Sequence, residues 1–326
     1  MWLLQTMKER LQQISEPIAT NIERFKNAYQ IALHSENPLL KQMVAHVNES
    51  TGKQMRPILV MLCAQLCGEV TPATIHAAVS VELLHVASLI HDDVIDESDE
   101  RRGNPSLLAK FQSKKAVLGG DYFLSTALAE AVKTGNIDVV NTIATMGKTL
   151  VDGELLQLSS SKDAIYQEQN YFNVIKAKTA ALFSTCAQLG VLSSNNTTEA
   201  AQKLVQMGEF IGICFQLKDD IFDYQTVGCT GKPAGNDIQE GKMTLPLLHV
   251  YEQADATEKA VILEAFQNKD VASIQQWVHQ KGGITYAQQQ IDYYKQKALQ
   301  CLQNFDNTPT RNAIEQFILL VADRQK

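Results

Sequence analysis

Two aspartate triplets with the same internal spacing lie inside apolar stretches of this chain. They are Asp92, Asp93 and Asp96 in LIHDDVID, and Asp219, Asp220 and Asp223 in QLKDDIFD. Both stretches read as helix, so the first and last aspartate of each triplet share one helix face. Like charges at this spacing repel each other, and carboxylates among apolar side chains cost desolvation free energy unless they are paired or bind a metal. A sequence that accepts this twice indicates a cation site, and oxygen-only ligands favour Mg²⁺.

The overall composition argues against a general nucleic-acid-binding protein. The chain has 326 residues, and its 29 basic and 36 acidic residues give a net charge of −7, whereas nucleic-acid binding needs a basic face. The six cysteines form no CxxC pair, which is typical of buried thiols in a reducing cytosol. The N-terminus does not read as a secretory signal, and no stretch approaches the ~20 apolar residues that span a bilayer. We therefore expect a cytoplasmic protein without a transmembrane segment.

Helical periodicity dominates the chain, and strict alternation of apolar and polar residues is scarce. A cap residue followed by proline opens three of the expected helices, at Asn37, Thr71 and Thr308. The expected helices cover residues 17–34, 38–48, 56–67, 72–98, 114–133, 137–161, 177–192, 197–225, 241–253, 257–267, 283–304 and 309–323. No break in composition divides the sequence, so we expect a single all-α domain over residues 1–326 and no sheet.

Basic side chains accompany both triplets along the chain. They are Lys53, Arg56, Arg101, Arg102, Lys178, Lys232 and Lys242, and His85 lies two helical turns before Asp92. Arginine and lysine bind phosphate oxygens, and Mg²⁺ held by carboxylates bridges to the same phosphates. The simplest ligand that matches both sets is a diphosphate with an apolar tail, and two cationic sets suit two such ligands.

These groups predict a reaction in which a diphosphate leaves. Metal ions and cationic side chains stabilise the negative charge on the departing diphosphate. If the tail is allylic, departure leaves a delocalised carbocation, which a dry helical cavity protects from water. The double bond of a second, homoallylic diphosphate can then act as the nucleophile, so no covalent protein nucleophile is required.

Four segments together resemble the trans-prenyltransferases, the polyprenyl diphosphate synthases of the isoprenoid synthase fold. They are HDDVIDESDERRG, KAKTAALF, FQLKDDIFDY and GKPAGNDIQEGKMTLP, and the resemblance covers about residues 50–250. It implies an all-α helical bundle around a central cavity, with about three Mg²⁺ ions in each active site. It also implies isopentenyl diphosphate and an allylic diphosphate as substrates, and a homodimer.

The resemblance implies roles for individual residues. The metal ligands would be Asp92, Asp96 and Asp219, with Asp93, Asp220 and Asp223 acting through waters or as second ligands. The allylic diphosphate would be held by Arg101, Lys178 and Lys232, and isopentenyl diphosphate by Lys53, Arg56, His85 and Arg102. Thr179 and Gln216 would line the allylic site, and Asp237 and Lys242 would support the metal-binding loop. The leaving diphosphate is the expected base for the final proton.

Small residues precede the first triplet on the helix along which the product of this family grows. Ala87 and Ser88 lie five and four residues before Asp92, which implies an open channel, and Phe123 is a candidate floor for it. Gln157 stands where short-chain members carry aspartate, which favours the medium- and long-chain branch. We therefore expect an all-trans product longer than C20, of about C30–C40, as in a quinone side chain. A C20 geranylgeranyl diphosphate is the alternative.

Other interpretations stay open at this stage. A class I terpene cyclase or a head-to-head condensing enzyme also uses Asp-rich helices, but cyclases replace the second triplet with an Asn/Ser/Glu pattern that this sequence lacks. A non-catalytic subunit with a degraded site would not keep all six aspartates. A catalytic subunit that needs a smaller partner is an alternative to the homodimer. Arg324 and Lys326 near the C-terminus could contact the diphosphates or be solvated.

Overall fold

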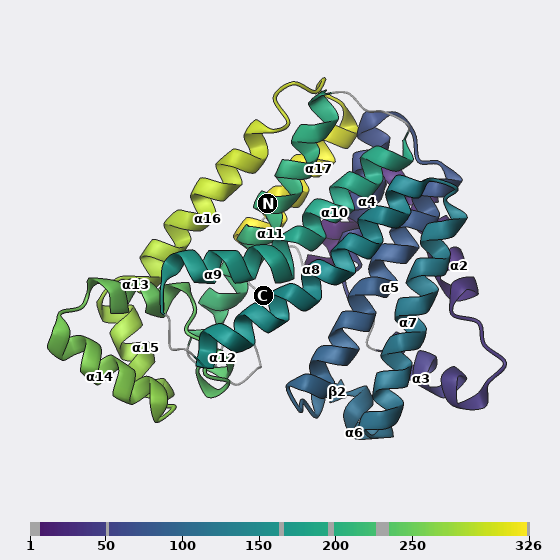
Figure 1. Cartoon of the computed structure of the whole chain (residues 1–326). Helices are drawn as coiled ribbons and strands as arrows, with labels where there is room; N and C mark the ends of the chain where they lie inside the picture. The colour runs from purple at the N-terminus through teal and green to yellow at the C-terminus, as the bar shows by residue number, and fades with distance from the viewer. Residues whose placement is uncertain (1–6, 50–51, 163–165, 195–198, 226–234, 325–326) are drawn as a thin grey trace. The chain divides into compact units, whose positions relative to one another are not determined.

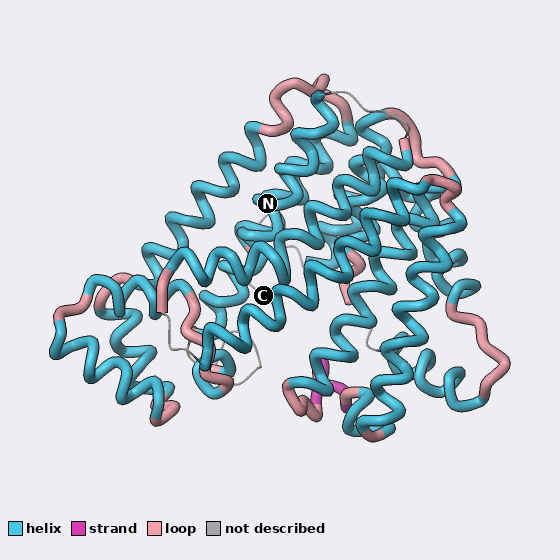
Figure 2. Tube along the Cα trace, viewed as in Figure 1, coloured by secondary structure: helices cyan, strands magenta, loops and turns pink. Residues whose placement is uncertain are grey.

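The computed structural model describes residues 7–49, 52–162, 166–194, 199–225 and 235–324, and helices dominate them (Figures 1 and 2). The α-helices are α1 (Met7–Ile14), α2 (Ala19–Ala32), α3 (Pro38–Glu49), α4 (Met55–Cys67), α5 (Pro72–Ile95), α6 (Leu107–Phe111), α7 (Ser113–Lys133), α8 (Ile137–Lys162), α9 (Glu168–Ile175), α10 (Ala181–Ser193), α11 (Glu199–Asp223), α12 (Asn236–Gln239), α13 (Leu245–Gln253), α14 (Ala256–Gln267), α15 (Val271–Gln280), α16 (Gly283–Gln300) and α17 (Pro309–Asp323). A 3₁₀ turn, η2 (Glu16–Ile18), precedes α2, and a π-helical turn, η3 (Lys176–Ala180), precedes α10. The expectation of an all-α fold is confirmed.

A short hairpin, which the sequence did not predict, follows the first triplet. Strand β1 (Glu100–Arg101) pairs antiparallel with β2 (Asn104–Pro105), drawn in magenta in Figure 2. The chain reverses through Arg102 and Gly103, which have φ values of 55° and 79°. Two residues per strand are too few to show an alternating pattern in the sequence. Arg101, in the first strand of the hairpin, lies beside the first triplet and donates to Asp93.

The three cap-and-proline signals are confirmed as helix starts. The Asn37 side chain accepts a hydrogen bond from the backbone N–H of Leu39 at 2.9 Å, Thr71 forms a capping box at the start of α5, and the Thr308 hydroxyl caps α17. Five α-helices were not expected from the sequence: α1, α6, α9, α12 and α15. Each has ten residues or fewer, so its periodicity is hard to separate from the surrounding loops.

The chain folds into two units that are each internally compact. Unit 1 comprises Met1–Lys148, Thr185–Val205 and Asn304–Gln316, and unit 2 comprises Thr149–Ser184, Gln206–Gln303 and Phe317–Lys326. The first triplet, at the end of α5, belongs to unit 1, and the second, at the end of α11, belongs to unit 2. The single domain expected from the sequence stays a prediction.

Helix α5 forms the centre of unit 1 and packs against α4 and α7 (Figure 1). Leu59 on α4, Leu83 on α5 and Phe123 on α7 are fully or almost fully buried. By length and composition α5 could cross a bilayer, with a mean hydropathy of 1.6 over its most apolar window. However, 67% of that window is buried inside the protein, as in the core helix of a globular domain.

In unit 2, glycines bring α11 against the segment that carries Lys178 and Thr179. A Cβ atom on Gly212 would lie 2.4 Å from the Cα atom of Ala180, and one on Gly208 would lie 2.6 Å from the carbonyl oxygen of Phe183. The close approach therefore requires residues without side chains at both positions. It brings the middle of α11, which leads into the second triplet, against η3 and the start of α10.

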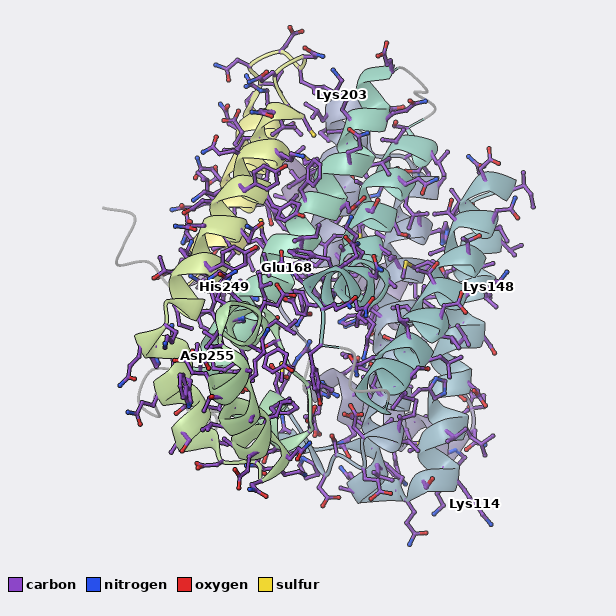
Figure 3. All side chains as sticks on the ribbon, turned by 60° about the vertical axis from the view of Figure 1, so that its left-hand side comes forward. Lys114, Lys148, Glu168, Lys203, His249 and Asp255 are labelled. Carbon is purple, nitrogen blue, oxygen red and sulfur yellow. The ribbon has the colours of Figure 1, made fainter. Side chains whose placement is uncertain are left out.

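Tyr286 on α16 connects α9 with α13 in unit 2. Its hydroxyl donates a hydrogen bond to Glu168 at 2.9 Å, and its ring stacks on His249 with 3.9 Å between centroids; Glu168 and His249 are labelled in Figure 3. These contacts hold α9 in place. The same helix presents Tyr171 to the second triplet.

Candidate active site

The first triplet lies at the C-terminal end of α5, and its three carboxylates differ in exposure. Asp93 is buried, Asp92 is half-buried and Asp96 is exposed. Arg101 donates two hydrogen bonds to Oδ1 of Asp93, one of them from Nε at 2.9 Å. Burial raises the pKa of Asp93, and the Arg101 guanidinium opposes this rise. Arg101 thus engages one oxygen of Asp93, and the metal-binding roles of Asp92, Asp93 and Asp96 stay a prediction.

A pocket in unit 1 is lined by two of the four residues predicted to hold isopentenyl diphosphate, His85 and Arg102. Its polar lining includes Glu82, His85, Asp93, Arg101 and Arg102. Gly52 also lines it, and a Cβ atom there would lie 2.5 Å from Nη1 of Arg102, so the loop before α4 runs directly over that guanidinium. The pocket therefore combines two arginines and a buried histidine within one wall of unit 1.

Burial lowers the pKa of His85 well below its ordinary value, and the charges of Arg56, Arg102 and Arg101 lower it further. The ring is therefore neutral at pH 7. A neutral imidazole donates one hydrogen bond and can do so to a phosphate oxygen without adding charge. Arg56 is thus close enough to act on His85, although it is not among the residues that line the pocket.

Among the residues predicted to hold isopentenyl diphosphate, Lys53 has the weakest connection with the unit 1 pocket. It is exposed, its Nζ atom lies 2.7 Å from Sδ of Met7, and it is not a lining residue. Its neighbour Gly52 does contact Arg102. The structure therefore brings His85 and Arg102 together and leaves Lys53 at the edge of the group.

Glu82 is a pocket residue that the sequence reasoning missed. It is 7% exposed, and burial raises the pKa of its carboxyl group, while Arg56 and Arg102 oppose the rise. The signal was available, because Glu82 interrupts the apolar run VSVELL three residues before His85, on nearly the same helix face. A carboxylate here balances the charge of the two arginines.

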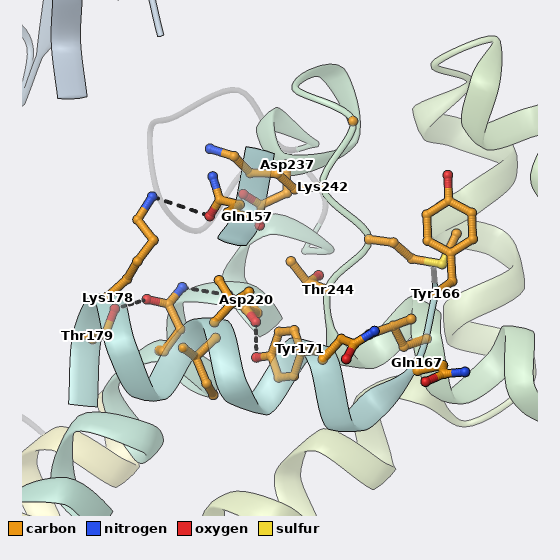
Figure 4. A pocket seen from close by; sticks show the side chains of 17 residues that line it. Gln157, Tyr166, Gln167, Tyr171, Lys178, Thr179, Asp220, Asp237, Lys242 and Thr244 are labelled. Carbon is orange, nitrogen blue, oxygen red and sulfur yellow. Dashed lines mark hydrogen bonds between the residues drawn. The ribbon is translucent and has the colours of Figure 1, made fainter. Parts of the chain in front are cut away.

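A second pocket, within unit 2, brings together six predicted residues (Figure 4). They are Lys178, Thr179, Gln216, Asp220, Asp237 and Lys242. The pocket is also lined by Gln157, which the sequence connects with chain length, and by Tyr166 and Tyr171. Of the residues predicted for the allylic site, Lys178, Thr179 and Gln216 lie in this pocket, whereas Arg101 lines the pocket of unit 1. The allylic site and the role of each residue stay a prediction.

A chain of hydrogen bonds crosses the floor of this pocket (Figure 4). The Thr179 hydroxyl donates to Oε1 of Gln216 at 2.8 Å, and Nε2 of Gln216 donates to Oδ1 of Asp220 at 2.8 Å. The Tyr171 hydroxyl donates to Oδ2 of Asp220. Burial raises the pKa of Asp220 to about 7, and the hydrogen bonds from Tyr171 and Gln216 oppose the rise. Tyr171 was missed because it lies on α9, which the sequence did not predict.

Lys178 lies in the π-helical turn η3 and faces α8. It forms an ion pair with Glu154 and donates a hydrogen bond to Oε1 of Gln157 at 3.3 Å. Gly153 permits this approach, because a Cβ atom there would lie 2.9 Å from the Cβ atom of Ala177. A π-helical turn shifts the helical register and often marks a functional position. Glu154 was missed by the sequence reasoning, although it lies between Gly153 and Gln157.

Asp219 and Asp223 of the second triplet have different partners. Oδ1 of Asp219 lies 2.8 Å from Nη2 of Arg324. The Asp223 carboxylate accepts hydrogen bonds from the backbone N–H groups of Gly235, Asn236 and Asp237, at 3.1, 2.9 and 3.0 Å. Asp223 therefore anchors the segment that leads into α12, and its proposed contact with metal stays a prediction.

Asp237 and Lys242 extend the pocket from the other side of the second triplet. Burial raises the pKa of Asp237, the charges of Asp220 and Asp223 raise it further, and Lys242 opposes the rise. Lys242 also pairs with Glu240. Lys232 lies outside the described residues.

The predicted chain-length residues belong to unit 1. Ala87 on α5 and Phe123 on α7 are each 1% exposed, and the Ser88 hydroxyl donates to the carbonyl oxygen of His85 at 2.9 Å. None of the three is a lining residue of the unit 1 pocket. Their role in chain length stays a prediction.

The donor atoms at both triplets suit magnesium. Each triplet offers carboxylate oxygens, the ligands that Mg²⁺ prefers over imidazole or thiolate. In the part of the chain that the structure describes, no group of three or more His, Cys, Asp or Glu residues is arranged to hold an ion. Mg²⁺ commonly keeps several waters and completes its shell with substrate phosphate oxygens, so one or two carboxylates are enough.

Comparisons with known proteins agree with this chemistry. The family model described as polyprenyl synthetase matches residues 37–281. The chain is 32% identical to octaprenyl diphosphate synthase of Escherichia coli (93% of this chain, 96% of the relative) and 32% identical to heptaprenyl diphosphate synthase component 2 of Geobacillus stearothermophilus (95% and 97%).

Solved structures give the same result. The crystal structure of geranylgeranyl pyrophosphate synthase from Bacteroides thetaiotaomicron matches with a TM-score of 0.84 and 39% identity (97% of this chain, 100% of that chain). A polyprenyl synthase from Caulobacter crescentus, complexed with calcium and isoprenyl diphosphate, matches with a TM-score of 0.90 and 27% identity (97% and 98%). The family match, the full-length relatives and the two pockets together show that the chain belongs to the polyprenyl synthetase family and is a prenyltransferase.

Proposed function

We propose that this prenyltransferase condenses an allylic diphosphate with isopentenyl diphosphate and makes an all-trans polyprenyl diphosphate longer than C20. The observation that carries the proposal is the unit 2 pocket, where Lys178 and Lys242 accompany the acidic groups Asp220 and Asp237. Cations and metal-binding carboxylates in one pocket suit the diphosphate of the allylic substrate.

The residues of this pocket would assist departure of the allylic diphosphate. Lys178 and Lys242 would bind its oxygens, and bound Mg²⁺ would supply further positive charge for the leaving group. As the C1–O bond breaks, the oxygens of Thr179 and Gln216 offer the negative ends of their dipoles to the nascent allylic cation. Their hydrogen bond at 2.8 Å fixes those dipoles before the reaction begins.

The residues of unit 1 would hold isopentenyl diphosphate. Arg56 and Arg102 would bind the diphosphate, and the neutral His85 would donate one hydrogen bond to it, with Lys53 at the edge. The double bond of this substrate attacks the allylic cation, so a new C–C bond forms. The resulting cation loses a proton to the departed diphosphate. This restores a double bond, and the products are the elongated allylic diphosphate and protonated diphosphate.

Magnesium is the proposed cofactor, with Asp92, Asp96 and Asp219 as the principal ligands and about three ions per active site. The structure neighbour from Caulobacter crescentus was solved with calcium and isoprenyl diphosphate, which supports a divalent ion beside a diphosphate. Removal of Mg²⁺ with EDTA should abolish turnover, and added Mg²⁺ should restore it.

A product of about C30–C40 is proposed over C20 because octaprenyl and heptaprenyl diphosphate synthases match 93% and 95% of this chain at 32% identity. The C20 alternative is supported by the geranylgeranyl pyrophosphate synthase neighbour. The test is incubation of the purified chain with Mg²⁺, isopentenyl diphosphate and farnesyl diphosphate, followed by reversed-phase thin-layer chromatography. Polyprenyl products longer than C20 are expected. A cyclised product without consumption of isopentenyl diphosphate would refute the proposal.

The channel assignment has its own test. Replacement Ala87→Phe puts a large ring on the buried face of α5, and we expect it to shorten the product sharply. Leu39→Phe, at an exposed position on α3, is the matched control and should leave the product unchanged. Unchanged chain length in Ala87→Phe would refute the assignment of Ala87, Ser88 and Phe123.

A cytoplasmic homodimer is the proposed assembly. On α7, the side chains of Leu118 and Val132 are 65% and 63% exposed, and Leu128 on the same helix is 38% exposed. Burial of such side chains against a second copy would stabilise the dimer. The alternative is a heteromer with a small subunit, since the relative from Geobacillus stearothermophilus is named as a component. Light scattering of the purified chain, with its activity measured alone, separates the two.

A further inference from the structure

We infer that Arg324 is a positioning residue for Asp219, holding one oxygen of that carboxylate so that the other is directed to a metal ion. The inference rests on the proposed function, because it assigns a role to a residue that supports the second triplet. Nη2 of Arg324 lies 2.8 Å from Oδ1 of Asp219. A charged residue near the C-terminus thereby contacts a carboxylate that precedes it by about a hundred positions.

Arg324 is fixed on one face of α11 by several contacts. Its Nη2 donates to the carbonyl oxygen of Phe215 at 2.7 Å, and its guanidinium lies 4.0 Å from the centroid of the Phe215 ring and 5.5 Å from that of Phe222. Phe215, Asp219 and Phe222 are four and three residues apart, so they share a helix face. With 7% exposure, Arg324 is buried rather than solvated.

The segment that carries Arg324 is anchored independently of Asp219. Lys295 on α16 forms ion pairs with Asp323, the last residue of α17, at 3.1 Å and with Asp292 at 2.8 Å. The end of α17 is therefore held against α16 directly before Arg324. This separates two functions of the C-terminal segment, since Lys295 anchors it and Arg324 reaches α11.

The contact leaves Asp219 able to bind a metal. Arg324 engages Oδ1, and the Asp219 side chain is still 44% exposed, so the contact does not bury the carboxylate. Hydrogen-bonding partners behind a metal ligand fix its orientation, and their loss typically weakens metal affinity about 10–100-fold. The planar guanidinium also bridges the carboxylate and a backbone carbonyl, which the single ammonium of lysine does less well.

The test measures Mn²⁺ binding, by electron paramagnetic resonance, to the full chain in the presence of inorganic pyrophosphate. We expect Arg324→Ala to raise the apparent Kd for Mn²⁺ about 10–100-fold, with partial recovery in Arg324→Lys. The comparison variant is Lys295→Ala, which removes the other anchor of the segment and should lower Mn²⁺ affinity far less, because Arg324 keeps its contacts with Phe215 and Asp219. Circular dichroism on all variants reports whether they fold.

A double-mutant cycle makes the assignment specific. In an Asp219→Ala background, Arg324→Ala should cause no further loss of Mn²⁺ affinity, because its partner is already gone. Unchanged or tighter Mn²⁺ binding in Arg324→Ala, or an equal loss in Lys295→Ala, would overturn the inference. If the unaltered chain binds no Mn²⁺ with pyrophosphate, the proposed function fails first, so the two failures are distinguishable.

Discussion

The two aspartate triplets have the same spacing and helical setting, but the protein supports them in different ways. In unit 1, Asp93 receives its partner from the adjacent hairpin, since Arg101 lies eight residues further along the chain. In unit 2, Asp220 receives Tyr171 from another helix 49 residues away, and Asp219 receives Arg324 from the C-terminal segment. The same motif is thus completed by local sequence in one unit and by tertiary packing in the other.

This difference has an energetic consequence. In the first triplet Asp96 is exposed and Asp92 is half-buried, and the buried Asp93 pairs with Arg101 from the same unit. Asp220 is 1% exposed, and its burial is offset by two hydrogen bonds. The burial of Asp220 therefore depends on side chains of α9 and α11, whereas that of Asp93 depends on the adjacent hairpin.

The largest expected effect comes from removing the predicted metal ligands themselves. Asp92→Ala and Asp219→Ala should each lower kcat at least about 10²–10³-fold, the loss typical of removing one group that stabilises developing charge. Incorporation of labelled isopentenyl diphosphate measures this. Glu240→Ala, an exposed acid near the second triplet, is the control and should retain most of the activity. Full turnover in either aspartate variant would contradict the metal assignment.

The next prediction concerns the pH dependence of stability, which should differ between the two triplets when no metal is bound. Because burial raises the pKa of Asp220 to about 7, its contribution to stability is complete below about pH 4 and is lost as pH rises through about 7. In EDTA, Asp220→Asn should therefore stabilise the protein relative to the unaltered chain at pH 8 but not at pH 4, by no more than about 4 kcal/mol.

Urea unfolding at pH 4, 6 and 8 provides the measurement, and Asp96→Asn is the control. Since Asp96 is exposed, its replacement should leave the pH dependence of stability nearly unchanged. If Asp220→Asn and Asp96→Asn changed the pH dependence of the unfolding free energy equally, the proposed difference in burial between Asp220 and Asp96 would be refuted.

The sequence predicted the helices well because their signals are local. Helix starts are marked by Asn37, Thr71 and Thr308. The side chain of each accepts a hydrogen bond from a backbone N–H group two or three residues further along the chain. The triplets and Lys178 were also found from local patterns. Charged side chains inside apolar segments cost desolvation free energy unless they bind a partner or a ligand, so they stand out in the sequence. The hairpin after α5 was missed because its strands have two residues each.

What the sequence could not predict are partners that meet only after folding. Tyr171 and Arg324 have no unusual sequence context, and each gains its meaning from a contact with α11. Glu154 likewise matters because Gly153 lets Lys178 approach α8. The sequence pattern identifies the charged side chains whose burial costs desolvation free energy. The tertiary packing determines which other side chains pair with them and offset that cost.

A smaller effect is expected from Asp223, which distinguishes an anchoring role from a metal-binding role. Asp223→Asn keeps one carbonyl oxygen for Gly235 and Asn236 but turns an N–H donor toward the N–H of Asp237. The loss of one acceptor costs about 1–2 kcal/mol, so we expect up to about a tenfold rise in KM for the allylic diphosphate.

The corresponding measurement for metal uses Mn²⁺ in the presence of pyrophosphate. If Asp223 mainly anchors the segment before α12, Asp223→Asn should change Mn²⁺ affinity far less than Asp219→Asn does. A loss of Mn²⁺ affinity as large as that of Asp219→Asn would identify Asp223 as a direct ligand. The second triplet would then bind metal through its first and last aspartates, as predicted for Asp92 and Asp96.

The smallest predicted effect tests the tertiary support of the second triplet most directly. Tyr171→Phe removes only the hydroxyl that donates to Asp220, while the apolar ring keeps its packing on Phe172. One lost hydrogen bond corresponds to about 1 kcal/mol, or roughly a fivefold lower kcat/KM. The hydroxyl lowers the pKa of Asp220, so its removal should also move the acidic limb of the pH–rate profile upward. Tyr166→Phe, in the same pocket, should leave that limb in place, and equal shifts in both variants would show that Asp220 does not depend on α9.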